Sequence, residues 1–135
     1  MGFSINQDNF SSAGRRMDER IFKIFEMIPS TGSTYRQPIY TDNHEIHLWR
    51  IRPGEWIYPH THPHSDDIWY IVQGEGEYYT ALNEKRTVRP GDVAVACPGD
   101  VHGIFNSGSE DIVLLSELSP LPVEIEEVPG FNYPE

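Results

Sequence analysis

The chain contains a single cysteine and no long apolar run. One cysteine, Cys97, excludes an internal disulfide and is typical of a reducing compartment. No stretch approaches the roughly 18 apolar residues of a membrane-spanning helix, and the polar opening residues contain no apolar segment of a signal peptide. These absences indicate a cytoplasmic protein with no membrane partner.

Basic residues are also scarce. The chain has 10 Lys and Arg residues against 21 Asp and Glu residues, which gives a formal net charge of -11, and no Lys/Arg-rich run occurs. A nucleic-acid partner is therefore not expected, because binding to a phosphate backbone requires a basic surface. The excess of acidic residues instead favours solubility.

Long helical patterns are absent after residue 34, where short apolar runs alternate with turn residues. We expect strands at residues 35–41, 45–51, 56–62, 67–73, 77–82, 86–88, 92–96, 102–106 and 112–117. Short strands at such regular spacing predict an all-β sandwich or barrel. The preceding stretch, residues 21–28, fits one face of a helix, but its β-branched and aromatic composition favours a strand.

Two arms are expected to flank this barrel domain, which spans residues 19–118. Residues 1–18 are polar and rich in small side chains, which predicts a flexible N-terminal arm. Residues 119–135 are acidic and rich in proline, and proline cannot donate the hydrogen bonds of a regular sheet. We therefore expect an extended C-terminal arm that lies on a surface or crosses to a second subunit.

Three histidines and one aspartate form the pattern that points to chemistry. His60 and His62 alternate in an expected strand, so their side chains share a face; Asp67 opens the next strand, and His102 stands alone farther along. Two such histidines are also compatible with a solvated surface. Imidazoles together with a carboxylate, however, suit a divalent transition metal such as iron, manganese, zinc, nickel or copper. We therefore predict one metal ion per chain.

The same residues carry a family resemblance. The spacing of the first motif of the cupin superfamily is matched by Gly54, His60, His62, Asp67 and Gly74, with Asp in the place of the family's Glu. The second motif is matched by Gly91, Cys97, Pro98, Gly99, His102 and Asn106, with Cys in the place of its first proline. Over roughly residues 35–118 the chain thus resembles a small single-domain cupin. The resemblance implies a double-stranded β-helix, or jelly-roll barrel, and a metal held by His60, His62, His102 and Asp67.

Asp67 leaves several arrangements open. Aspartate is one methylene, roughly 1.5 Å, shorter than the family's glutamate. Either the strand moves inward, or Asp67 binds through water, or three histidines alone hold the metal. His64 is an alternative ligand because it continues the alternation of His60 and His62, although Pro63 is expected to turn the chain before it. Asp66 is expected to face away from Asp67 and to be solvated.

Alternation along the strands also predicts what surrounds the metal. The residues that share a face with a candidate ligand are Trp56 and Tyr58 beside His60, Trp69 and Ile71 beside Asp67, and Ile104 beside His102. Each of these side chains is a candidate for a substrate pocket, although for each one alone ordinary core packing is the more common role.

The family resemblance implies a metal-dependent enzyme that acts on a small organic molecule by dioxygenase-like, isomerase or decarboxylase chemistry. The alternative is a non-catalytic cupin that binds or senses a small ligand, because a fold alone does not select a reaction. No acid/base pair beyond the metal site is evident in the sequence, which favours chemistry centred on the metal. The resemblance to small single-domain cupins, which form dimers, also implies a homodimer.

Overall fold

The computed structural model describes residues 20–133, and nearly all of its regular structure is β-strand. The strands are β1 (Tyr35–Tyr40), β2 (Glu45–Ile51), β3 (Trp56–Thr61), β4 (Asp66–Gln73), β5 (Gly76–Ala81), β6 (Glu84–Val88), β7 (Val93–Ala96), β8 (His102–Phe105), β9 (Ile112–Ser119) and β10 (Glu126–Glu127). The first nine match the strands expected from sequence to within two residues at either end. The tenth, in the C-terminal arm, was not expected.

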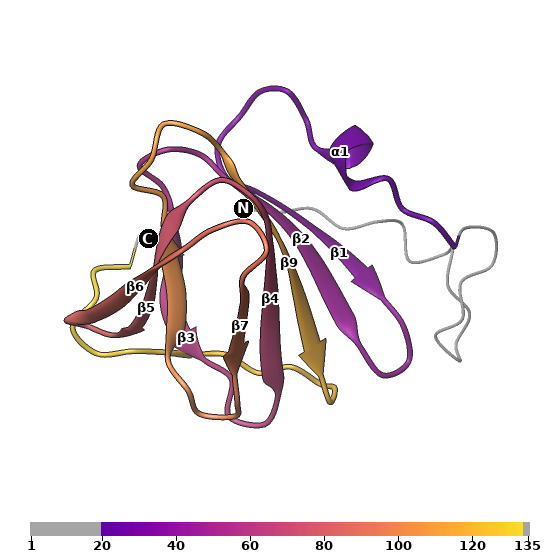
Figure 1. Cartoon of the computed structure of the whole chain (residues 1–135). Coiled ribbons are helices and arrows are strands. Elements are labelled where there is room, and N and C mark those ends of the chain that lie inside the picture. The colour runs from indigo at the N-terminus through magenta and orange to yellow at the C-terminus, as the bar shows by residue number, and fades with distance from the viewer. Residues whose placement is uncertain (1–19, 134–135) are drawn as a thin grey trace.

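These strands form two antiparallel sheets that face each other across the core (Figure 1). One sheet has the order β1-β2-β9-β4-β7 and the other has the order β10-β3-β8-β5-β6. The main cluster of buried side chains lies between them and consists of Ile51, Ile57, Trp69, Ile71, Tyr78, Val88, Ile104, Ile112 and Leu114. The all-β prediction of a jelly-roll barrel is therefore confirmed.

The strand expected at residues 21–28 is wrong, because this segment contains the short helix α1 (Ile24–Met27). The apolar residues Ile24, Met27 and Ile28 pack against a cluster on the outer face of the first sheet that includes Leu48 and Val113. They are spaced at i, i+3 and i+4, so one helical turn brings all three to the same surface. A strand would have divided them between two faces.

Arg50 fastens the loop after α1 to the same outer face. Its side chain is buried, and its Nη1 and Nη2 atoms donate hydrogen bonds to the carbonyl oxygens of Pro29 and Ser33, each at 2.7 Å. Burial lowers the pKa of this guanidinium. Arg50 thus has a structural role, and His47, on the opposite face of β2, is left to point into the barrel.

A β-bulge interrupts β3 before the first candidate ligand. Ile57 pairs with Ile104 of β8 and is buried in the core, whereas Trp56 pairs with Phe105, and their tilted rings lie with centres 4.7 Å apart. The register then shifts, and His60 pairs with His102. Strict alternation from His60 back to Trp56 was therefore a wrong assumption, because the bulge inserts an extra residue between them.

The C-terminal arm does not leave the barrel but crosses its open side. After β9 the chain passes below the strands and returns along β3 towards the side of β5 and β6 (Figure 1). Its strand β10 pairs with Thr61 and His60 of β3, and the hydroxyl of Tyr133 donates a hydrogen bond to the carbonyl of Pro59. Residues 1–18, expected to be a flexible arm, lie outside the described residues.

No helix within residues 20–133 is long and apolar enough to cross a membrane.

Candidate metal centre

Four candidate ligands from three strands meet inside the barrel. His60 lies on β3, and His62 is the first residue after that strand. Asp67 lies on β4, and His102 is the first residue of β8. All four side chains are buried, and one potential ligand atom from each lies within 4.8 Å of the corresponding atoms of the others. The antiparallel pairing of β3 with β8 produces this meeting, because it places His60 opposite His102.

Backbone carbonyl groups fix the orientation of all three imidazole rings. The Nδ1 atoms of His60, His62 and His102 lie 2.6, 2.7 and 3.0 Å from the carbonyl oxygens of Tyr58, Glu124 and Asp100, respectively. A carbonyl oxygen can only accept, so each Nδ1 carries the hydrogen and the neutral ring presents a lone pair at Nε2. This is the arrangement found where histidine binds a metal through Nε2.

Asp67 completes a set of acceptor atoms that needs a cation. Its Oδ2 atom lies 2.9 Å from His102 Nε2 and 3.2 Å from His62 Nε2, while Ser116 Oγ donates to its Oδ1 at 2.5 Å. A carboxylate oxygen and an unprotonated nitrogen repel each other at this range unless a proton or a metal lies between them. Ligand atoms about 2.0–2.1 Å from a metal are themselves separated by about 2.9–3.4 Å. The cluster therefore fits a metal ion, and the shorter carboxylate reaches far enough.

The acid–base properties of the cluster follow from burial and from these contacts. Burial, followed by the neighbouring His102, lowers the pKa of His60 to about 4, so this ring is neutral at pH 7. Burial alone would raise the pKa of Asp67, but hydrogen bonds with His102, His62 and Ser116 lower it well below its usual range. Burial would lower the pKa of His62, but the hydrogen bond to Asp67 raises it. The carboxylate therefore stays charged and attracts one positive charge.

The structure does not bring His64 to this cluster. Its side chain is exposed, and its Nε2 atom lies 3.4 Å from a carboxylate oxygen of Glu124. Trp69, Ile71 and Ile104 belong to the buried core cluster, and Trp69 packs edge-on against His102 with ring centres 5.6 Å apart. These three side chains support the site from inside the core.

A cavity of about 530 Å³ opens beside His60 and His62. The residues that line it come from β1, β2, β3, β9, the residues next to these strands and the C-terminal arm: Thr34, Arg36, Glu45, His47, Trp49, Trp56, Ile57, Tyr58, His60, His62, Leu118, Val123, Ile125, Glu127 and Tyr133. Trp56 and Tyr58 are thus among the lining residues, and the Trp56 ring also contacts the rings of Tyr79 and Phe105. The cavity borders the candidate metal centre on the side of His60 and His62.

Several residues of the site were missed by sequence reasoning. Ser116 is the polar member of an otherwise apolar inward series on β9, with Ile112 and Leu114 before it, so alternation could have identified it. Arg36 could not have been identified, because its place depends on how β1 pairs with β2. The hydrogen bond from His62 to the backbone of Glu124 likewise depends on where the C-terminal arm crosses.

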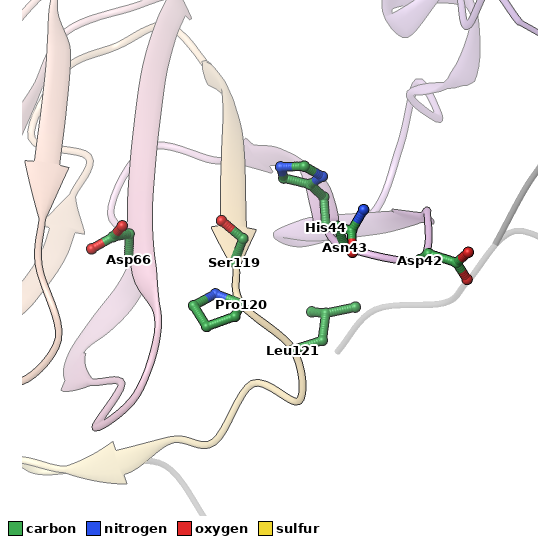
Figure 2. A pocket seen from close by; sticks show the side chains of 7 residues that line it. All are labelled: Asp42, Asn43, His44, Asp66, Ser119, Pro120 and Leu121. Atoms are coloured by element: carbon green, nitrogen blue, oxygen red, sulfur yellow. The ribbon is translucent and has the colours of Figure 1, made fainter. Parts of the chain in front are cut away.

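A second hollow of about 320 Å³ is lined by none of the candidate ligands (Figure 2). It is lined by Asp42, Asn43, His44, Asp66, Ser119, Pro120 and Leu121. Asp66 therefore faces away from Asp67, as alternation along β4 predicts. None of these seven side chains is buried, so the hollow lacks the enclosed polar groups of a catalytic site.

Several known proteins are similar to this chain. The oxalate-binding protein of Thermotoga maritima is 32% identical over 68 residues, or 50% of this chain and 54% of that protein. The chain spans about half the length of the curated relatives it matches. A crystal structure of an uncharacterised conserved protein with a double-stranded β-helix domain, from Klebsiella pneumoniae, is 34% identical with a TM-score of 0.75. The match covers 82% of this chain and 92% of the Klebsiella chain.

A predicted oxalate decarboxylase from Thermotoga maritima has a similar structure, with 28% identity and a TM-score of 0.53 over 56% of this chain and 65% of that one. The family model described as a cupin domain matches residues 47–117, which is more than half of the chain and includes all four candidate ligands. The chain belongs to the cupin domain family.

Proposed function

We propose that the protein is a metal-dependent enzyme that acts on a small organic molecule, with the metal held by His60, His62, Asp67 and His102. The observation that carries this proposal is the convergence of three Nε2 atoms and one carboxylate beside a cavity. A purely structural cluster would not require three buried imidazoles around one carboxylate, two of them with Nε2 against its Oδ2 atom. Iron, manganese, zinc, nickel and copper are all compatible with this ligand set.

The surroundings of the cluster support chemistry on a bound ligand. A divalent metal at this position would supply Lewis-acid or redox chemistry of the dioxygenase, isomerase or decarboxylase type. The residues of the chain would do the rest. Apolar side chains such as Ile57 and Leu118 would exclude water, and His47 Nε2, 2.9 Å from Glu45 Oε1, can hold or transfer a proton inside the cavity.

The alternative is a barrel that binds a small ligand without turnover. One observation favours it: a curated relative is named an oxalate-binding protein. A similar solved structure, described as a predicted oxalate decarboxylase, favours the enzyme. The two proposals share the cavity and the metal, and they differ in whether a bound molecule is converted.

The proposal is tested by elemental analysis of protein purified without a metal-affinity tag. We expect close to one metal per chain in the wild type, loss of the metal in His102→Ala, and full retention in the matched control His64→Ala, whose side chain is exposed. Iron or manganese would direct substrate screening towards oxygen chemistry, and zinc or nickel towards isomerisation. Failure of the wild type to bind any of the five candidate ions would refute the proposal.

We also propose a cytoplasmic homodimer built from the barrel domain of residues 19–118 with two flanking arms. A second copy of the chain is supported by Tyr70, Val93 and Val95, which are 42%, 54% and 59% exposed on the outer face of β4 and β7. Sedimentation equilibrium tests this assignment, and a stable monomer at micromolar concentration would exclude it. The cytoplasmic location is supported by the free, exposed thiol of Cys97.

A further inference from the structure

One basic side chain, that of Arg36, lines the cavity beside the candidate metal centre. Arg36 lies on β1 opposite Trp49 of β2, and its guanidinium carbon is 5.9 Å from the centre of the Trp49 ring. Its neighbours Tyr35 and Gln37 are buried on the other face of the strand. Strand alternation therefore turns Arg36 into the barrel, towards the same space that His60 and His62 face.

Arg36 has no acidic partner among the residues that the structure describes. Within residues 20–133, no hydrogen bond or ion pair joins its guanidinium to another side chain or to the backbone, whereas Arg52 and Arg89 contact Asp111 and Glu75. The carboxylate of Glu45 is engaged elsewhere, because its Oε1 atom lies 2.9 Å from His47 Nε2. In a chain with 21 acidic and 10 basic residues, an unpaired arginine inside a cavity is available for an anion from outside. A planar guanidinium matches a carboxylate with two parallel hydrogen bonds.

The charges around the cavity are unevenly placed. A divalent ion held by one carboxylate and three neutral imidazoles would keep one positive charge, and Arg36 adds a second. The carboxylates of Glu45 and Glu127 also line the cavity and offset these charges in sum. Glu45 lies 2.9 Å from His47, and Glu127 is exposed on the C-terminal arm, so within residues 20–133 neither forms an ion pair with Arg36.

The cavity has room for a ligand larger than oxalate. At about 30 Å³ for each water molecule, 530 Å³ corresponds to about 18 waters, which is far more than the six non-hydrogen atoms of oxalate displace. Much of the remaining lining is apolar or aromatic, and includes Trp49, Ile57, Leu118, Val123 and Ile125. An apolar wall favours a ligand with an apolar or aromatic body.

From these observations we infer that the cavity binds an organic carboxylate with an apolar or aromatic body larger than oxalate, and that Arg36 binds its carboxylate. This inference deepens the proposed function and rests on it for the metal. Arg36 lies on β1 of one sheet, and His60 and His102 lie on β3 and β8 of the other, so a ligand that contacts Arg36 and reaches these histidines bridges the two sheets of the barrel. Arg36 then selects the substrate class, and the metal centre performs the chemistry.

Titration calorimetry on zinc-loaded protein tests this inference with three probes: benzoylformate, its uncharged methyl ester, and oxalate. We expect benzoylformate to bind at least 10-fold more tightly than either of the others. Arg36→Gln should weaken benzoylformate binding by about 10- to 100-fold, because a charge-assisted hydrogen-bonded pair is lost, and should leave the ester and the zinc stoichiometry unchanged. Arg36→Lys, which keeps the charge but loses the fork, should recover only part of the affinity.

The matched control is Arg86→Gln, which removes an exposed arginine from β6 and should change nothing. Fluorescence gives a second readout, because a ligand on Arg36 should quench the Trp49 indole beneath it, and Trp49→Phe should abolish that quenching. Equal affinity of wild type and Arg36→Gln for benzoylformate would overturn the inference. Equal affinity for benzoylformate and its methyl ester would also overturn the inference. Tighter binding of oxalate than of benzoylformate would overturn the conclusion that the ligand is larger than oxalate.

Failure of the inference can be told apart from failure of the proposed function. If the protein binds no zinc, the proposed function fails, and the role of Arg36 is then decided on metal-free protein with benzoate against benzamide. There we expect benzoate to bind more tightly, with the difference lost in Arg36→Gln. If zinc binds but Arg36→Gln has no effect on either acid, the metal site stands and the assignment of Arg36 falls.

Discussion

Ser116 decides which oxygen of the Asp67 carboxylate faces the histidines. Its hydroxyl donates to Oδ1 at 2.5 Å, and this leaves Oδ2 directed at His62 and His102. The pair lies between neighbouring strands, since β9 and β4 are adjacent in one sheet. A short carboxylate has little freedom to reach a metal, so the hydrogen bond that fixes its angle acts directly on metal affinity.

We predict that Ser116→Ala lowers metal affinity by about 10-fold, at the lower end of what is lost when a hydrogen bond to a ligand is removed. The protein should stay folded, because the change deletes one buried oxygen without adding volume. Competition with a metal-sensitive dye measures the affinity, and Ser119→Ala, on the same strand but half-buried near the second hollow, is the control. Unchanged affinity in Ser116→Ala would show that Asp67 does not depend on this contact.

Single residues of the site differ in how far sequence could predict them. The three histidines follow from alternation and spacing, because both are properties of the chain itself. Sequence alone could not decide whether the Asp67 carboxylate reaches the histidines. Aspartate is shorter than glutamate by one methylene, and a strand can shift by more than that length without any sign in the sequence. Arg36 and its lack of a partner depend on the pairing of strands, which no local pattern contains.

At the scale of elements, the bulge in β3 is the feature that sequence reasoning overlooked. Proline in a strand interior removes a backbone donor and is often found at a bulge, so Pro59 was a usable signal. The strands themselves were predictable because each has its own turn residues and apolar face. The helix α1 was not predictable, because the eight residues 21–28, most of them apolar, fit both the helical and the strand periodicity.

The C-terminal arm is the element that connects the fold to the metal centre. Its backbone carbonyl at Glu124 accepts the hydrogen of His62 Nδ1 at 2.7 Å, and its end is held by Tyr133. The Tyr133 hydroxyl donates to the carbonyl of Pro59 and accepts from the backbone nitrogen of Val128 at 2.7 Å. Tyr133 therefore positions His62 through the arm without touching it.

We predict that Tyr133→Phe loosens this arm and speeds the release of bound metal about fivefold, since one hydrogen bond contributes about 1 kcal/mol. Hydrogen exchange should rise in residues 123–133 and stay constant in β9. Tyr70→Phe, which alters an exposed tyrosine of β4, is the control. Equal rates of metal release from Tyr133→Phe and the wild type would mean that the arm does not hold His62 in place.

At the scale of the whole molecule, the order of the strands in the two sheets brings the residues of the site together. Strand β9 lies between β2 and β4, and β8 lies between β3 and β5, so residues far apart in sequence become neighbours. Local patterns predict the strands but not this order. The family resemblance implied a jelly-roll barrel, and each of its two motifs includes one strand from either sheet: β3 and β4 in the first motif, β7 and β8 in the second. Metal binding should consequently stabilise the entire fold, because the ligands connect both sheets.

We predict that this stabilisation grows between pH 5 and pH 8. In the metal-free protein, burial lowers the pKa of His62, but the contact with Asp67 outweighs it and raises the pKa above its ordinary value of about 6.5. A raised pKa means that the proton on His62 stabilises the folded chain below pH 6.5, and that this contribution is lost as the pH rises through the raised value. A metal must displace that proton, so the metal competes with it at low pH. His60, with a pKa of about 4, is already neutral over this range and releases none.

The measurement is the thermal midpoint of zinc-saturated protein minus that of EDTA-treated protein, at several pH values from 5 to 8. The difference should be small at pH 5 and should increase as the pH passes the raised pKa of His62, because the metal-free form then loses its bound proton and leaves Asp67 beside two unprotonated rings. His64→Ala should show the same increase, since its exposed ring takes no part. A difference independent of pH would mean that no proton occupies the cluster in the absence of metal. The charge of Asp67 would then be balanced by another group in the barrel.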